Sequence, residues 1–328
     1  MKGPERDPAH WSRQNERAAG YWQLKLLLVL FRAFPVFVLR AVAFPIGFCY
    51  FLFSKNARAE SRRFLQKVAP FVDDPALAKK CRSPAGALRH IVSFSLASIE
   101  KIQSWGGKFP FKNVRFQDDD IADLVRNLEN GKGAFLICSH LGNAELLRGL
   151  ADFDRTGVSR KITVTVIMDT KVTAHFNRMI KELNPRSGMD IIGAGEIGPE
   201  TAVLLEDRLA AGGLVAITGD RTSAGGGKNT PLPFLGKDAP FPAGVFHMAS
   251  LMNAPIYFVF GLRRRDLSLM PKYDMHVRKS DISFDRSRKE RLAQCDLLAR
   301  SYASLLEAHC KERPFQWYNF FDFWRREE

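Results

Sequence analysis

The spacing of hydrophobic and polar positions changes along the chain and predicts strands and helices in turn. Strands are expected where short runs are almost entirely apolar, as in buried strands: residues 134–139, 162–168, 189–192, 214–219 and 254–262. Helices are expected where apolar residues recur with helical spacing: residues 85–104, 119–130, 173–184, 199–213, 241–253 and 287–312. Strands that alternate with helices predict an α/β fold with a mainly parallel central sheet flanked by helices.

The first part of the chain has a different pattern. Residues 1–20 are polar and charged, whereas residues 21–53 are apolar apart from Lys25, Arg32 and Arg40. At about 100° per residue, a helix places these three cations within a sector of roughly 80° and leaves the rest of its circumference apolar. This predicts a helix in the membrane interface whose cations reach toward lipid phosphates. A bilayer span with snorkelling cations and a buried helix packed on the protein are the alternatives.

These patterns divide the chain into a polar tail (residues 1–20), a membrane-associated helical segment (21–55) and one globular domain (56–328). Four basic residues follow the apolar segment: Lys55, Arg58, Arg62 and Arg63. Such a basic flank favours anionic lipid and the cytoplasmic side of a membrane.

Composition narrows the possible partners and the compartment. Among 328 residues, 49 Lys and Arg against 35 Asp and Glu give a net charge of +14, which indicates an anionic partner. The basic residues are scattered through apolar elements without a nucleic-acid-binding motif, so we expect no nucleic-acid partner. The five cysteines are dispersed and never form CxxC, which argues against disulfides or a zinc site and favours a reducing compartment.

The first candidate for chemistry is His140, which directly follows the expected strand 134–139. Ligands of parallel sheets bind at the carboxyl ends of strands. Glu145 lies at the start of the next apolar segment, from where its carboxylate could fold back onto one ring nitrogen. The other nitrogen would then be available as a base. In the alternative reading, Asn143 caps a helix and Glu145 merely suits its dipole.

The spacing between His140 and Glu145 is not informative by itself. With 7 His and 35 acidic residues, chance alone predicts roughly 0.7 such pairs. A second pair, His276 and Asp281, does occur, in a polar stretch without a strand. The position of His140 between a strand and a helix therefore carries the prediction.

A second candidate is the sequence GAGEIG at residues 193–198, with Asp220 at the end of the next strand. Strand, GxGxxG, helix, strand and acid form the fingerprint of a dinucleotide site, so an oxidoreductase is the alternative function. Two observations weigh against it. The preceding strand is very short, and Glu196 and Glu200 put carboxylates where a pyrophosphate would bind.

A third candidate begins at Asp220 and Arg221, just after a strand. Arg221 could bind phosphate while Asp220 fixes its position. The following segment, residues 229–242, contains four prolines among Leu and Phe, and we expect a loop that lines a groove for a hydrocarbon chain. Ordinary loop packing is the alternative.

Taken together, these segments resemble the bacterial lysophospholipid acyltransferase superfamily, and more narrowly the late lauroyl/myristoyl acyltransferases of lipid A biosynthesis. The resemblance covers nearly the whole chain. Four motifs carry it in order: His140-Leu-Gly-Asn-Ala-Glu145, Gly219-Asp220-Arg221, Phe234-Leu-Gly236 running into Phe241-Pro-Ala-Gly244, and Pro314-Phe-Gln-Trp-Tyr-Asn-Phe-Phe-Asp-Phe-Trp324. The acid of the first motif is Glu, where the glycerol-phosphate branch usually has Asp.

The resemblance implies a membrane-associated O-acyltransferase whose catalytic domain is residues 56–328. A fatty acyl group would pass from an acyl thioester, carried by acyl carrier protein or CoA, to a hydroxyl of a lipid or glycolipid. His140 would be the general base and Glu145 would hold the imidazolium. Residues expected to bind substrate are Asn143, Arg148, Asp220, Arg221, Phe234 and Gly236.

The same resemblance implies no metal and no cofactor beyond the thioester co-substrate. Expected partners are the phospholipid surface, the lipid or glycolipid acceptor and acyl carrier protein. The expected location is the inner membrane, with the site on its cytoplasmic side. Cys138 lies within an apolar strand, so we expect it to be a core residue and not a nucleophile.

Overall fold

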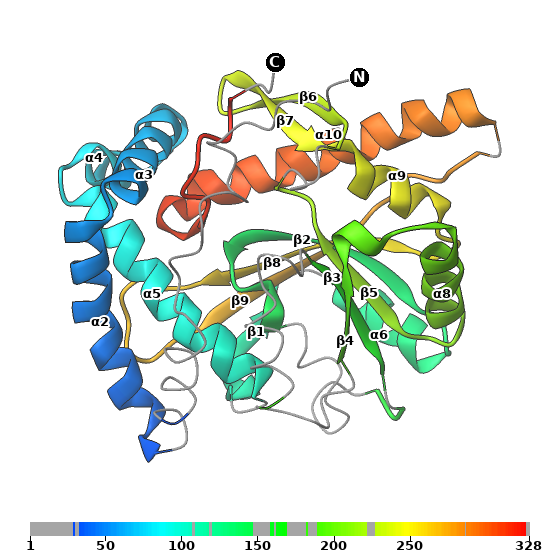
Figure 1. The fold of residues 1–328 in the computed structure, drawn as a ribbon, viewed down its shortest axis with the longest axis horizontal. Helices are drawn as coiled ribbons and strands as arrows, with labels where there is room; N and C mark the ends of the chain where they lie inside the picture. Colours follow the sequence, from blue (N-terminus) through cyan, green and yellow to red (C-terminus); the bar gives the residue numbers. More distant parts are fainter. Residues whose placement is uncertain are drawn as a thin grey trace, which may run out of the picture.

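A computed structural model describes residues 29, 33–106, 109–117, 120–146, 158–160, 162–168, 182, 189–221, 227–285 and 287–325. A central sheet occupies the middle, and helices lie against it (Figure 1). In sheet order its strands are β1 (Val114–Phe116), β9 (Tyr273–Lys279), β8 (Ile256–Arg263), β2 (Ala134–Gly142), β5 (Leu214–Thr218), β3 (Val164–Met168) and β4 (Met189–Gly193). Neighbouring strands are parallel except β8 and β9. The predicted mainly parallel sheet is confirmed.

The described α-helices follow the strands along the chain much as the sequence predicts. They are α2 (Val36–Phe53), α3 (Lys55–Val68), α4 (Pro75–Arg82), α5 (Gly86–Trp105), α6 (Asp120–Glu129), α8 (Pro199–Ala210), α9 (Ala243–Leu251) and α10 (Arg288–Glu312). The helix expected at 173–184 lies outside the described residues. Helices α3 and α4 and strands β1 and β9 had no sequence prediction.

Strand β2 shows why its run of residues is apolar throughout. Phe135 and Ile137 belong to a core shared with α8, α9 and α10. Leu136 and Cys138 point to the other face, into a second core shared with α6. Because both faces of the sheet are covered, the strand needs apolar side chains at every position, and no alternation remains in its sequence.

Residues 229–242 form no open loop. They make an antiparallel hairpin of β6 (Asn229–Phe234) and β7 (Lys237–Pro242). Leu235 and Gly236 both have positive φ at its turn, as a two-residue hairpin turn requires. Phe234 is fully buried, with its ring stacked on Trp324 and edge-on to Trp317. In this structure Phe234 is a core residue and Gly236 lies in the turn. That they bind substrate stays a prediction.

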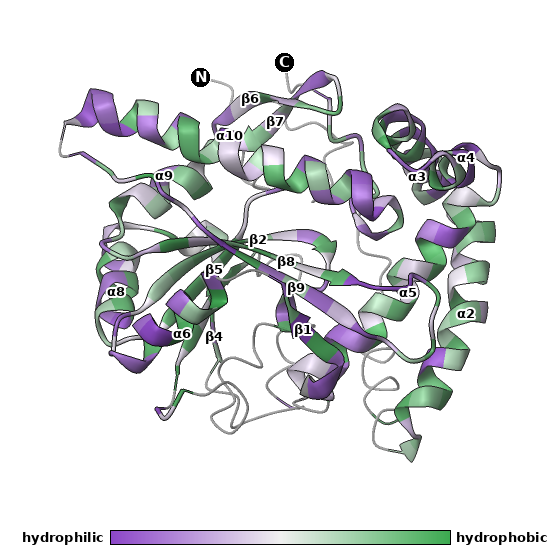
Figure 2. Cartoon of the chain, turned by 180° about the vertical axis from the view of Figure 1, so that it is seen from behind, coloured by the Kyte–Doolittle hydropathy of each residue, from purple (hydrophilic) through white to green (hydrophobic). Residues whose placement is uncertain are grey.

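Helix α2 packs along α5 through one narrow face and leaves the other uncovered (Figures 1 and 2). Leu39, Ala43 and Gly47 are buried, whereas Phe37 is 63% and Phe53 is 84% exposed. By length and composition α2 could cross a membrane: it has 18 residues and a mean hydropathy of 2.1.

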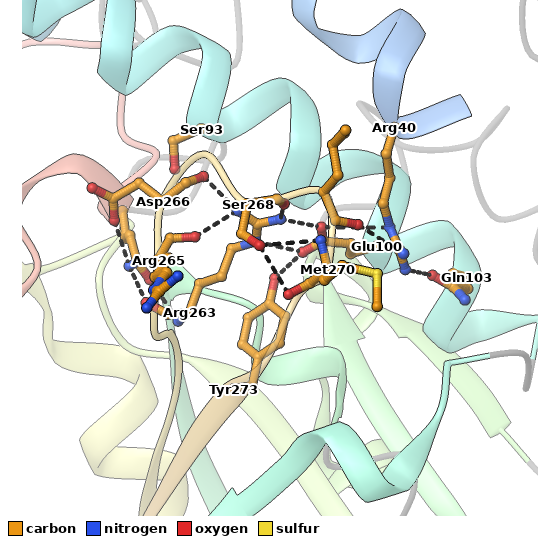
Figure 3. A network of polar contacts seen from close by, with 12 residues as sticks. Arg40, Ser93, Glu100, Gln103, Arg263, Arg265, Asp266, Ser268, Met270 and Tyr273 are labelled. Atoms are coloured by element: carbon orange, nitrogen blue, oxygen red, sulfur yellow. Dashed lines mark hydrogen bonds and ion pairs between the residues drawn. The ribbon is translucent and has the colours of Figure 1, made fainter. Parts of the chain in front are cut away.

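Arg40 does not reach toward lipid, contrary to the sequence prediction. Its side chain is buried against α5, where it donates a 2.5 Å hydrogen bond to Gln103 and lies 3.9 Å from Glu100 (Figure 3). Glu100 in turn forms a two-point ion pair with Arg263 of β8, at 2.7 and 3.0 Å, and both residues are fully buried. Helical spacing identified the face of Arg40 but not what that face contacts. Lys25 and Arg32 lie outside the described residues.

Candidate active site

The centre of the site is set by the neighbouring strands β2 and β5. Their register pairs Cys138 with Thr218. Two residues further on, His140 and Asp220 therefore meet at the carboxyl ends of the two strands. These ends are where ligands of open parallel sheets bind.

A bulge shapes β2 at this point. Toward β8, the register passes from Cys138 opposite Val259 to Gly142 opposite Gly261, so β2 contains extra residues around His140. Gly142 has φ of 70°, and a Cβ there would overlap the carbonyl oxygen of Gly261. Glycine is thus required for the close backbone approach that keeps the bulge in place.

His140 and Asp220 form a closely coupled dyad. The ring Nδ1 of His140 lies 2.7 Å from Oδ1 of Asp220, and the backbone N–H of His140 donates to Oδ2 at 2.7 Å. The carboxylate only accepts, so Nδ1 carries the proton, and Nε2 of the neutral ring keeps its lone pair. The His140 side chain is 21% exposed, whereas that of Asp220 is fully buried.

Electrostatics favour a neutral imidazole beside an ionised carboxylate. Burial lowers the pKa of His140, the charge of Arg221 lowers it further, and Asp220 only partly opposes them. For Asp220, burial favours the protonated form. The attraction of His140 and the hydrogen bonds from His140 and Trp317 outweigh it, so the pKa of this carboxyl lies below its usual value. At neutral pH the dyad therefore holds a free base.

The C-terminal segment, residues 314–325, closes around the dyad from a distant part of the chain. The indole N–H of Trp317 donates to Oδ2 of Asp220 at 2.9 Å, and the Tyr318 N–H donates to the carbonyl of His140 at 3.2 Å. Arg221 donates to the side chain of Asn319 at 2.8 Å and to the carbonyl of Tyr318 at 3.0 Å. The motif at 314–324 was noted in the sequence, but no role could be assigned to its residues.

Glu145 occupies a different place from the one expected. Its carboxylate pairs with Lys101 of α5 at 3.4 Å, and Asp220 takes the position at the ring nitrogen. Residues 144–146 form a short 3-10 turn and not the first turn of an α-helix. The charge of Lys101 nevertheless contributes to the lowered pKa of His140.

The other expected site residues differ in their surroundings. Asn143 is fully buried, and neither atom of its side-chain amide has a hydrogen-bond partner. Arg148 lies outside the described residues. Cys138 is buried in the sheet, and burial raises the pKa of its thiol far above the usual value, as expected of a core residue. No three His, Cys, Asp or Glu side chains in the described ranges gather closely enough to hold a metal.

The GAGEIG segment does not have the geometry of a dinucleotide site. Strand β4 is the last strand of the sheet, not one at a reversal of strand order. Gly193 and Gly198 have negative φ, and a Cβ at Gly195 or Gly198 would meet nothing within 4 Å. Neither Gly193 nor Gly198 therefore needs to be glycine for its backbone conformation. The oxidoreductase alternative receives no support.

Comparison with known families identifies the family to which the chain belongs. The sequence matches the family described as bacterial lipid A biosynthesis acyltransferase over residues 7–326. The chain belongs to this family. This lipid A acyltransferase family member is thus a transferase that moves an acyl group in lipid and lipopolysaccharide biosynthesis, and the resemblance noted from the motifs is confirmed. No characterised protein matches the chain closely enough to refine the substrate.

Proposed function

We propose that this family member transfers a fatty acyl group from an acyl thioester to a hydroxyl of a lipid or glycolipid, with His140 as general base. The His140–Asp220 dyad at the carboxyl ends of two parallel strands is the observation that carries the proposal. A neutral imidazole with one nitrogen on a buried carboxylate is suited to accept a proton on the other.

The reaction follows from this arrangement. Nε2 of His140 accepts the proton of the acceptor hydroxyl while the hydroxyl oxygen forms a bond to the carbonyl carbon of the thioester. The resulting oxyanion collapses, the C–S bond breaks, and the imidazolium returns the proton to the departing sulfur. Asp220 stabilises the imidazolium between these steps and keeps the ring in its orientation. No acyl-enzyme forms, and the thioester is the only co-substrate.

Arg221 is the candidate residue for stabilising the negative charge that develops on the carbonyl oxygen during the reaction. Its guanidinium is already oriented by Asn319 and the carbonyl of Tyr318, so it requires little reorganisation during the reaction. We assign it to the oxyanion or to a phosphate of a substrate. We also propose that the polar part of a substrate contacts the turn that follows β2. The groups available there are the amide of Asn143, which has no hydrogen-bond partner, and the ion pair of Glu145 with Lys101.

Two features support a membrane setting and an acidic donor. Helix α2 has an uncovered apolar face, and α3, which follows it after Ser54, begins with the basic residues Lys55 and Arg58. We propose that this surface holds the enzyme on the cytoplasmic side of the inner membrane. The net charge of +14 would attract acyl carrier protein, which is acidic, as a carrier of the acyl group.

Lipid mass spectrometry tests the proposal in the native host. A strain lacking the gene is complemented with the wild type or with His140→Ala. We expect one lipid species to gain a fatty-acyl mass with the wild type only, which also identifies the acceptor. Equal restoration by both proteins, present at equal levels in the membrane, would show that His140 is not the base.

A further inference from the structure

A second site-like feature lies apart from the dyad. An open cavity of about 510 Å³ forms where the end of α3, the start of β7 and the C-terminal segment meet. Its lining consists of three cations, two acids and one indole: Arg63, Lys67, Lys237, Asp238, Asp322 and Trp324. Neither His140 nor Asp220 belongs to it, so the acyl-transfer proposal leaves this cavity unexplained.

Some charged side chains of the cavity already have partners of opposite charge. Arg63 donates to both carboxylate oxygens of Glu60, at 2.9 and 3.0 Å, and pairs with Asp322 at 2.8 Å. Asp238 has interactions of its own. The guanidinium of Arg63 is therefore fully compensated, and Asp322 is already engaged.

The two lysines are in a different situation. Within the described part of the chain, neither Lys67 nor Lys237 forms an ion pair or donates a hydrogen bond from its ammonium group. Lys67 Nζ lies 4.3 Å from the centre of the Trp324 ring, which provides an attractive but weak contact. Burial, and then the charge of Lys237, lower the pKa of Lys67. Arg63 acts in the same direction and Asp322 opposes them.

The ammonium groups of Lys67 and Lys237 repel each other, and their N–H donors are available. An anion bound between them would reduce this repulsion and accept hydrogen bonds from both. We propose that the cavity binds a phosphate group, as a monoester or diester, between Lys67 and Lys237, with Trp324 as its wall. A phosphate offers several acceptor oxygens to two point charges at once, and lysine is a common phosphate ligand. The cavity is much larger than a phosphate and accommodates the group that the phosphate carries.

A lipid headgroup and a soluble phosphate ester share this chemistry. Helix α3, which carries Lys67, follows α2 after the single residue Ser54, and α2 has the uncovered apolar face. The experiment therefore includes both sources. It does not depend on acyl transfer, so failure of this proposal and failure of the proposed reaction are distinguishable.

The test compares two double variants of the full chain in uncharged detergent micelles or on vesicles. Lys67→Met with Lys237→Met removes the proposed ligands. Lys79→Met with Lys80→Met removes the same charge from the exposed surface of α4. Calorimetry measures binding of inorganic phosphate. Flotation measures binding to phosphatidylcholine vesicles with and without phosphatidylglycerol, and thermal melts confirm that each variant is folded.

We expect the Lys67/Lys237 variant to lose at least tenfold in affinity for phosphate or for the anionic vesicles, and the Lys79/Lys80 variant to stay within about threefold of the wild type. A loss confined to the vesicles assigns the site to a lipid headgroup, and a loss confined to inorganic phosphate assigns it to a soluble ester. Equal effects of the two variants in both assays would overturn the proposal, because general surface charge would weaken binding by a similar factor for either pair of lysines.

Discussion

The indole N–H of Trp317 should influence the pH dependence of the reaction although it touches no reacting atom. Among the described residues it is one of three N–H groups that donate to the carboxylate of Asp220, together with the backbone and ring N–H of His140. Trp317→Phe removes this donor and keeps an aromatic ring. With one donor fewer, the carboxylate becomes more basic and stabilises the imidazolium more strongly. The pKa of His140 should therefore rise.

The size of the effect follows from the contacts. A hydrogen bond to a charged group contributes about 1.5–3 kcal/mol. Since 1.36 kcal/mol is one pKa unit, the proton affinity of Asp220 rises by roughly one to two units. Only part of this change passes through the 2.7 Å contact to His140. The acid limb of the kcat/KM profile should thus move to higher pH by a few tenths of a unit to about one unit.

The assay measures acyl transfer from an acyl thioester between about pH 5 and 8 for the wild type, Trp317→Phe and Trp324→Phe. Trp324 is a matched control: it lies in the same segment, contacts the same Phe234, and donates its N–H to the Phe234 carbonyl at 3.2 Å. The wild-type limb should lie below the usual histidine value, since the pKa of His140 is lowered. Identical limbs for all three proteins would refute the reasoning.

Three other changes test the surroundings of the site. Burial lowers the pKa of His90 to about 4, so the unfolded state binds more protons than the folded state below about pH 6.5. Urea titrations should therefore show the unfolding free energy falling by about 3 kcal/mol between pH 6.5 and 4. His90→Gln should make the unfolding free energy depend less on pH in this range. Glu100→Gln leaves Arg263 buried without its charge partner and should lower the unfolding free energy by about 3–5 kcal/mol, seen as a lower urea midpoint. Gly142→Ala strains a backbone at φ of 70° and should reduce both stability, by about 1–3 kcal/mol, and kcat, whereas Gly195→Ala should be neutral in melts and assays.

The sequence predicted those elements whose burial dictates their composition. Strands covered on both faces, such as β2 and β8, are continuous apolar runs and were found within a few residues. The β6–β7 hairpin was missed because its four prolines are typical of a loop. In a separate two-stranded ribbon Pro231 and Pro240 face each other, and few backbone donors are needed there.

For the site, local pattern identified His140 but not its partner. The position of His140 after a strand is a local feature, whereas the neighbour of that strand depends on sheet order, which the sequence does not contain. Because β5 lies beside β2, the carboxylate at the ring is Asp220, 80 residues away, and not Glu145 in the same motif. Trp317 and Asn319 reach the site through the same long-range packing, so the motif at 314–324 was visible in the sequence but the roles of these two residues were not.

We infer that Asp220, and not Glu145, orients His140 for its role as general base. The direct test is kcat/KM for acyl transfer by Asp220→Asn and Glu145→Gln, with folding of both variants checked by thermal melts. We expect Asp220→Asn to lower kcat/KM by about 10²–10⁴-fold, the range that general acid–base catalysis contributes, and Glu145→Gln to lower it far less. Activity abolished by Glu145→Gln but largely retained by Asp220→Asn would contradict it.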